Sequence, residues 1–187
     1  MITIRTATEA DIDMIAALHV RVWRMTYRSL APSLAHERLD EAHRRPGWAA
    51  LIGTGHPDCG ALVADGVDGI TGVIGFAPSS APVFGARGEV RHLYVDPAAR
   101  GQGIGRCLMS AAATRFHDAG HTGMGLAVVE GNDAAFTFYR ALGGRLAGRF
   151  RDPGPLWRSD NLVMIWDDLD ALSSLDRDRS ATSERAT

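Results

Sequence analysis

The sequence predicts one mixed α/β domain in which helices pack against a β-sheet. Short alternating or wholly apolar runs indicate strands, and longer runs with apolar residues three and four positions apart indicate amphipathic helices. The two kinds of run follow one another in the order β-α-α-β-β-β-α-β-α-β-β. The chain has 187 residues, 45% of them hydrophobic. It can therefore bury one sizeable core but is short for two.

The N-terminal half is expected to form a strand, two helices and three further strands. Residues 2–8 alternate and are rich in β-branched side chains, and residues 9–30 carry apolar side chains at helical spacing. A second helix is expected over residues 33–45, because Pro46 would end it. Two strands over residues 59–66 and 69–78, joined by a glycine-containing turn at 65–69, then precede the fourth strand.

The C-terminal half is expected to alternate helices with strands. A helix is predicted over residues 104–119, and residues 124–129 are almost wholly apolar, which is typical of a strand buried on both faces. Asn132 is a good N-cap for the next helix, and two strands follow it. From Ser173 onward the sequence is polar. We therefore expect a domain over residues 1–172 and a disordered tail over residues 173–187.

Composition argues against several classes of protein. The formal net charge is −2 and the arginines are scattered along the chain. A nucleic-acid-binding domain usually has a basic face, so we expect no nucleic-acid partner. No apolar run approaches the roughly 18 residues of a membrane helix, and no secretory signal is recognisable, so no membrane association is expected. The two cysteines form no dense framework, which favours a cytoplasmic location. All 20 basic residues are arginines.

A glycine-rich stretch, Arg100-Gly101-Gln102-Gly103-Ile104-Gly105, lies between a predicted strand and a predicted helix. The first amides of a helix lack intrahelical partners, and glycine lets an anion approach them closely. The stretch therefore predicts a cradle for a pyrophosphate. A Walker A loop is excluded because it needs a lysine, and the third glycine of a dinucleotide fingerprint is missing.

Two motifs together resemble the GNAT superfamily of acyl-CoA-dependent N-acyltransferases. The glycine-rich stretch matches the family pattern [RQ]-x-x-G-x-[GA], and the preceding Val-Asp-Pro also fits. The second motif, N-x-x-A-x-x-F-Y-x-x-x-G, is matched by Asn132, Ala135, Phe138, Tyr139 and Gly143. The resemblance covers about residues 1–170. It implies the GNAT fold, with a mixed central sheet that splays apart between its fourth and fifth strands.

The resemblance also implies that acetyl-CoA is the co-substrate and that no metal is needed. The pyrophosphate would bind at the start of the third helix, and pantetheine would pair with strand backbone where the sheet splays. The implied cofactor-binding residues are Leu93, Val95, Arg100, Gly101, Gln102, Gly103, Ile104, Gly105, Arg106, Asn132, Ala135 and Phe138.

The resemblance implies transfer of an acetyl group to a primary amine, with Tyr139 as the general acid that protonates the departing sulfur. The base is left open between Glu89, His92 and a water relay, with Glu89 preferred. Alternation along a strand places Glu89 and His92 on opposite faces unless a bulge intervenes. A catalytically silent acyl-CoA sensor is the alternative function. A longer donor such as succinyl-CoA, met by Arg87 and Arg91, is a weaker one.

The acceptor site of the family is walled by the first two helices and the last hairpin loop. Here these segments supply Trp23, Tyr27, Trp48 and Trp157 together with carboxylates such as Asp40. Trp23 and Tyr27 lie four residues apart and share a helix face, which suits an amine through stacking or cation–π contact. The acceptor, a small-molecule or peptide amine, is not identified further. A homodimer is consistent with the family, but no interface is visible.

Overall fold

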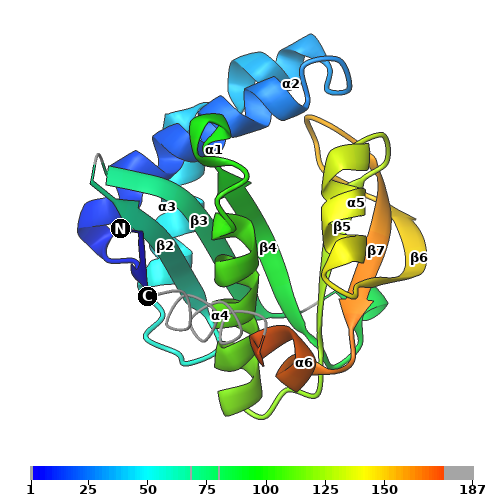
Figure 1. Ribbon diagram of the computed structural model, residues 1–187. Helices are drawn as coiled ribbons and strands as arrows, with labels where there is room; N and C mark the ends of the chain where they lie inside the picture. The colour runs from blue at the N-terminus through cyan, green and yellow to red at the C-terminus, as the bar shows by residue number, and fades with distance from the viewer. Residues whose placement is uncertain (1, 68, 80, 175–187) are drawn as a thin grey trace.

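A seven-stranded mixed sheet forms the centre of the molecule, with helices on both faces (Figure 1). The computed structural model describes residues 2–67, 69–79 and 81–174. The strands are β1 (Thr3–Thr6), β2 (Gly60–Gly66), β3 (Gly69–Pro78), β4 (Gly88–Val95), β5 (Met124–Val129), β6 (Arg145–Arg151) and β7 (Asp160–Trp166), in the spatial order β1-β2-β3-β4-β5-β7-β6. The predicted mixed α/β class and the predicted GNAT-type sheet are confirmed.

Six α-helices accompany the sheet in the part of the chain that the structure describes. They are α1 (Ile12–Thr26), α2 (Ser33–Arg38), α3 (Glu41–Ile52), α4 (Ile104–Asp118), α5 (Asp133–Ala141) and α6 (Leu169–Ser174). Short 3-10 turns occupy Glu9–Asp11, Pro82–Phe84 and Pro97–Ala99.

Two hydrophobic cores lie on opposite faces of the sheet. The larger one packs α4, α5 and α6 against strands β2 to β5 and β7, and contains fully buried side chains such as Leu108, Phe116 and Met124. The smaller one packs α1 and α3 against β2 and β3, around Ile15, Trp48 and Val73. The helices thus form a layer on each face of the sheet, as their apolar spacing requires.

The second predicted helix is two helices in the structure. Residues 33–45 divide between α2 and α3, because Asp40 adopts an extended conformation and caps α3 by accepting a hydrogen bond from the His43 amide at 2.8 Å. Pro46 does not end the helix but lies inside α3, which continues to Ile52. The prediction that Pro46 ends the helix was therefore wrong.

A short helix, α6, follows the last strand and was not expected. Its Leu169 and Leu172 are buried in the larger core, and the Ser110 hydroxyl on α4 donates to the Ser173 carbonyl at 2.7 Å. The helix runs two residues beyond the expected domain boundary at residue 172. Residues 175–187, the rest of the expected tail, lie outside the described residues.

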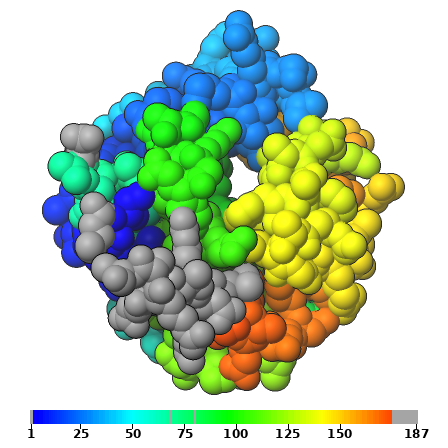
Figure 2. Space-filling view, in the orientation of Figure 1, coloured from blue at the N-terminus to red at the C-terminus, as the bar shows by residue number. Residues whose placement is uncertain are grey.

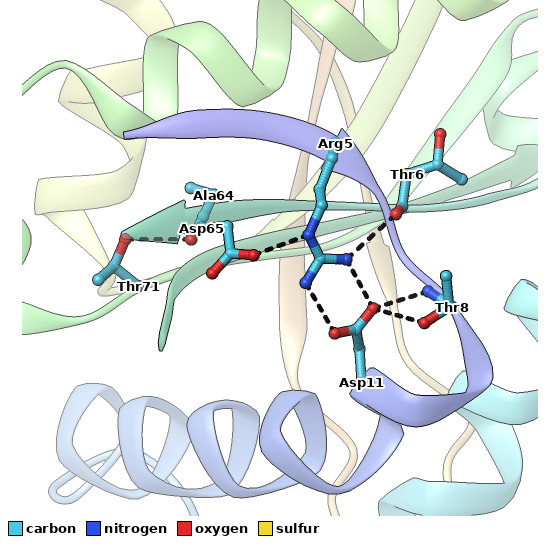
Figure 3. A network of polar contacts seen from close by, with 7 residues as sticks. All are labelled: Arg5, Thr6, Thr8, Asp11, Ala64, Asp65 and Thr71. Carbon is cyan, nitrogen blue, oxygen red and sulfur yellow. Dashed lines mark hydrogen bonds and ion pairs between the residues drawn. The ribbon is translucent and has the colours of Figure 1, made fainter. Parts of the chain in front are cut away.

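Arg5 joins the edge strand β1 to β2 and to the 3-10 turn at Glu9–Asp11 (Figure 3). The Arg5 guanidinium contacts both oxygens of Asp11 at 2.8 and 2.9 Å and Asp65 of β2 at 2.8 Å. Asp11 also accepts from the amide and the hydroxyl of Thr8 in a capping box. These contacts hold the pKa of Asp11 well below its usual range, and the hydrogen bond from Arg5 makes the largest contribution.

The sheet divides between β4 and β5. These strands run parallel and pair only through Gly88 with Met124 and Glu89 with Gly125. Beyond Glu89 the two strands do not pair, and Figure 1 shows β4 and β5 diverging. The backbone edge of β4 from Leu93 to Val95 therefore has no partner in β5. This is the splay that the family resemblance implies, and it opens the space in which the candidate site lies.

Candidate active site

A cavity of about 680 Å³ opens from the splay between β4 and β5. Figure 2 shows the molecule hollowed between the N-terminal helical segment in blue, the β4–α4 segment in green and the α5 segment in yellow. Five elements and one loop line it: α1, β4, the glycine loop, α4, β5 and α5. The residues predicted for the site that line this cavity are Tyr27, Leu93, Val95, Arg100, Gly101, Gly103, Ile104, Gly105, Arg106, Asn132, Ala135, Phe138 and Tyr139.

The glycine loop forms one end of the cavity. Gly101 and Gly103 adopt φ values of 78° and 84°, which favour glycine, and Gly103 is the N-cap of α4. The first helical hydrogen bond runs from the Cys107 amide to the Gly103 carbonyl at 3.0 Å. The amides of Ile104, Gly105 and Arg106 thus have no acceptor within the helix. With the helix dipole and the exposed side chains of Arg100 and Arg106, they can hold an anion.

All three tyrosines of the chain line this cavity: Tyr27 from α1, Tyr94 from β4 and Tyr139 from α5. Burial raises the pKa of each phenol above its usual value, and the nearby Tyr27 phenol raises that of Tyr139 further. Each phenol therefore stays protonated through neutral pH and can donate a hydrogen bond. Sequence reasoning missed Tyr94, because no motif marks it.

Two contacts hold α5 against the other walls of the cavity. Asn132 caps α5 by accepting from the Ala135 amide at 3.3 Å, and its side-chain amide donates to the Tyr27 hydroxyl at 3.5 Å. Phe138 covers Gly105 so closely that a Cβ added there would lie 3.0 Å from its ring. Gly105 thus lets α5 pack against the start of α4, which fixes the position of Tyr139.

Glu89 lies outside the cavity lining, in the short segment where β4 still pairs with β5. Its carboxylate is 3.6 Å from the Arg91 guanidinium, and burial raises its pKa despite that positive charge. The β3–β4 register shifts at this point, since Gly75 pairs with His92 but Phe76 pairs with Val90. Arg91 is thus an extra residue in β4.

The bulge at Arg91 inverts the alternation of β4. Val90 and Leu93 consequently pack in the same core, the one beneath α4. Glu89 and His92 therefore belong to the same face of the sheet, because the bulge that the sequence analysis named as the exception is present. His92 contacts Trp48, His19 and Tyr94, and burial lowers its pKa to about 3.

An aromatic cluster borders the α1 side of the cavity. The ring centroids of Trp23 and Tyr27 are 5.5 Å apart, and Trp157 from the β6–β7 loop lies 5.8 Å and 5.2 Å from them. Trp23 is only 5% exposed and supports Tyr27 from behind rather than lining the cavity. Trp48 belongs to the core, where it is 1% exposed and donates to His19 Nδ1 at 3.2 Å. Its placement in the acceptor wall was wrong.

Other predicted residues have different surroundings. Gln102 lines a separate cavity of about 710 Å³ between α1 and the β2–β3 turn. Arg87 binds Asp167 at 2.8 Å and Arg91 faces Glu89, so both arginines already have carboxylate partners. These pairings give no support to a second carboxylate on the acyl donor.

Within residues 2–67, 69–79 and 81–174, no group of three or more His, Cys, Asp or Glu side chains is arranged to hold a metal ion. Over the same residues, no helix combines the length and the apolar character needed to cross a membrane.

Residues 21–143 match the sequence pattern of the Acetyltransferase (GNAT) family, and the chain belongs to this family of acetyltransferases. The protein named uncharacterized N-acetyltransferase YuaI of Bacillus subtilis is 28% identical over 180 residues, which cover 94% of this chain and 98% of that protein. The matched region contains both the glycine loop and Tyr139, so the family and the cavity point to the same part of the molecule.

Solved structures resemble the whole described fold. The yncA protein of Salmonella typhimurium, a putative acetyltransferase solved with acetyl-CoA, has a TM-score of 0.66 and 24% identity, covering 91% of this chain and 95% of its own. The PaiA N-acetyltransferase of Thermoplasma acidophilum, solved with coenzyme A, has a TM-score of 0.68 and 19% identity, covering 89% and 99%. At these identities the likeness shows the fold.

Proposed function

We propose that the protein transfers an acetyl group from acetyl-CoA to a primary amine by direct attack. One observation carries this proposal: a single cavity joins the unused amides of the glycine loop, the unpaired edge of β4 and the Tyr139 phenol. An anion site, an extended backbone edge and a protonated acid are what an acyl carrier with a diphosphate would require. The catalytic domain would extend from residue 1 through the end of α6, two residues beyond the expected boundary at 172, and act in the cytoplasm.

The residues of the cavity fit acetyl-CoA. The amides of Ile104 to Arg106 would hold the pyrophosphate, aided by the Arg100 and Arg106 side chains. The backbone of Leu93 and Val95 would pair with the pantetheine amides, and Asn132, Ala135 and Phe138 would contact the carrier from α5. When bound, acetyl-CoA supplies the thioester that the amine attacks.

Tyr139 would act as the general acid. Tyr139 lines the cavity from α5, and burial keeps its phenol protonated well above neutral pH. As the C–N bond forms and the C–S bond breaks, the phenol would give its proton to the departing sulfur. The fixed packing of α5 on Gly105 would hold the hydroxyl in position.

The proton that leaves the attacking amine would pass through water to Glu89. A relay is needed because Glu89 does not line the cavity itself. Its raised pKa makes it a better proton acceptor than an ordinary glutamate. His92 is the poorer candidate, since a pKa of about 3 leaves its imidazole only weakly basic.

The test is a broad panel of amines with acetyl-CoA, in which release of free thiol is recorded. An enzyme would release thiol in proportion to the acetylated amine. Glu89→Gln would slow the release most for strongly basic amines, because these are protonated at neutral pH and must lose a proton before they attack. If no amine released thiol while acetyl-CoA still bound, the chain would be a silent acyl-CoA sensor instead. The sensor alternative has little support, because it needs no phenol in the cavity.

A further inference from the structure

One arginine near the aromatic cluster lacks the partners that its charge requires. Arg44 lies on α3, half-buried, with its Cζ atom 5.7 Å from the centroid of the Trp23 ring. Its Nε is buried, and within the described part of the chain it has no hydrogen-bond partner. A buried polar group that stays unpaired destabilises a fold. Arg44 is thus retained at a cost to the folded state.

The nearby carboxylates are committed to other groups. Asp40 caps α3, and Glu41 pairs with Arg45, which also binds Asp13 at 2.5 Å. Among residues 2–67, 69–79 and 81–174, no carboxylate forms an ion pair with Arg44. Burial lowers the pKa of Arg44, so its surroundings disfavour the charge that they leave unbalanced.

The rings around Arg44 bring no counter-charge. Burial lowers the pKa of both His19 and His92, and the Arg44 charge contributes to each shift, so both imidazoles are neutral. Because Trp48 donates to His19 Nδ1, the proton of His19 lies on Nε2. A cation among neutral aromatic rings attracts an anion more strongly than the same cation in water.

Arg44 lies close to the wall of the cavity. The Arg44 charge acts on Tyr94, which lines the cavity and also interacts electrostatically with Tyr139. Trp23, beneath the guanidinium, packs against Tyr27 of the same wall. Arg44 is not among the residues that line the cavity, and its guanidinium lies behind Trp23 and Tyr27. The unbalanced charge is therefore behind the α1 wall, the side on which we expect the acceptor.

We propose that Arg44 binds a carboxylate on the acceptor, so that the substrate is a small amine of the amino-acid class. This inference rests on the proposed function and names the acceptor class for the same site. The planar guanidinium suits a carboxylate because it offers parallel N–H donors. Binding the carboxylate would supply the missing counter-charge and direct the amine of the same molecule toward Tyr139.

The test compares free amino acids with their amides as acceptors, for the wild type, Arg44→Met and Arg45→Met. Methionine matches the volume of the arginine stem without its charge. Arg45 is the matched control, since it follows Arg44 on the same helix but already has carboxylate partners, and its side chain is 41% exposed. Calorimetric titration of the same amino acids into the CoA-loaded protein measures their binding without turnover. Thermal unfolding of each variant measures its stability.

The wild type should prefer an amino acid to its amide by about tenfold or more in kcat/KM, chiefly through KM. Arg44→Met should lose this preference and weaken amino-acid binding by a similar factor, while its melting temperature does not fall. Arg45→Met should keep the preference. Arg44→Lys should recover part of it.

Several results would overturn the inference. One is a wild type that treats acids and amides alike, and another is an Arg44→Met variant that keeps the preference. Acetylation of amines without a carboxylate, C-terminally amidated peptides included, but of no amino acid would refute Arg44 as a carboxylate site and leave the proposed function standing. If no amine released thiol, the proposed function would fail, and calorimetry would still decide whether Arg44 binds the carboxylate.

Discussion

The side-chain amide of Asn132 donates to the hydroxyl of Tyr27 at 3.5 Å, and so joins α5 to α1 at the edge of the cavity. The same side chain caps α5 through its oxygen, which accepts from the Ala135 amide. One residue therefore has two separable functions. The cap fixes the start of the helix that carries Tyr139, and the amide group ties that helix to the C-terminal end of α1.

Substitutions at Asn132 should separate these two functions. Asn132→Ala removes the cap and should lower the free energy of unfolding by about 1 kcal/mol. Asn132→Asp keeps a capping oxygen, so it should unfold within about 0.5 kcal/mol of the wild type. It should nevertheless bind acetyl-CoA more weakly, because a carboxylate would border the cavity. Urea unfolding and calorimetry measure both; an Asp variant as unstable as the Ala variant would contradict the capping interpretation.

Tyr139→Phe removes the proposed acid and little else. Loss of an acid should lower kcat by about 10²- to 10⁴-fold, while the Kd of acetyl-CoA stays within about twofold. Because burial raises the pKa of Tyr139, the wild-type rate should show no loss of the acid up to about pH 9. Steady-state kinetics and calorimetry test this. An unchanged kcat would remove Tyr139 from the mechanism.

Gly103→Ala should weaken acetyl-CoA binding. A Cβ at a φ of 84° costs about 1–2 kcal/mol and would turn the first amides of α4 away from the anion. Gly120→Ala is the matched control, because Gly120 has a φ of 86° at the other end of α4. Both variants should lose similar stability without ligand.

With ligand at a hundred times its Kd, the free energy of unfolding of the wild type and of Gly120→Ala should each rise by about 2.7 kcal/mol, whereas that of Gly103→Ala should rise less. Equal gains would refute the cradle.

Asp11→Asn should destabilise the fold by about 2 kcal/mol at neutral pH, because it breaks the charged contacts with Arg5. The folded-state pKa of Asp11 is depressed, so its contribution is present above the unfolded value near 4 and is lost as pH falls below it. The variant should therefore differ from the wild type less at pH 3 than at pH 7. Asp13→Asn, at a carboxylate whose side chain is 79% exposed, should change stability by under about 0.5 kcal/mol. A pH-independent difference would contradict the ion-pair assignment.

Helices and strands were predictable where turn residues or glycines in the sequence mark their ends. β3 and β5 coincide with the predicted runs at residues 69–78 and 124–129, because apolar residues there are bounded by turns. The start of α4 was predictable from the glycines before Ile104. The boundary at Asp40 was not, because two short helices share one continuous helical pattern. α6 was missed because two buried leucines in six residues give too little periodicity.

Residues of the candidate site were predictable where a motif marks them. They were not predictable where tertiary contacts determine their surroundings. Gly103, Asn132 and Tyr139 carry family spacing, and all three line the cavity. The bulge at Arg91 depends on the register with β3, which no local pattern encodes. Arg44 resembles a solvated helix residue in the sequence, and only the packing of Trp23 against it reveals a buried charge.

Because β4 and β5 pair through so few residues, the junction between them depends strongly on Gly88. It is one of two residues in β4 that meet β5, and a Cβ there would lie 2.3 Å from the Phe116 ring. Any side chain at this position would push Phe116 aside and force the two halves of the sheet apart at their single junction. Gly88 lies at the opposite end of β4 from the glycine loop. A screen for variants with weaker coenzyme binding should nonetheless find substitutions at Gly88 as well as substitutions in the loop.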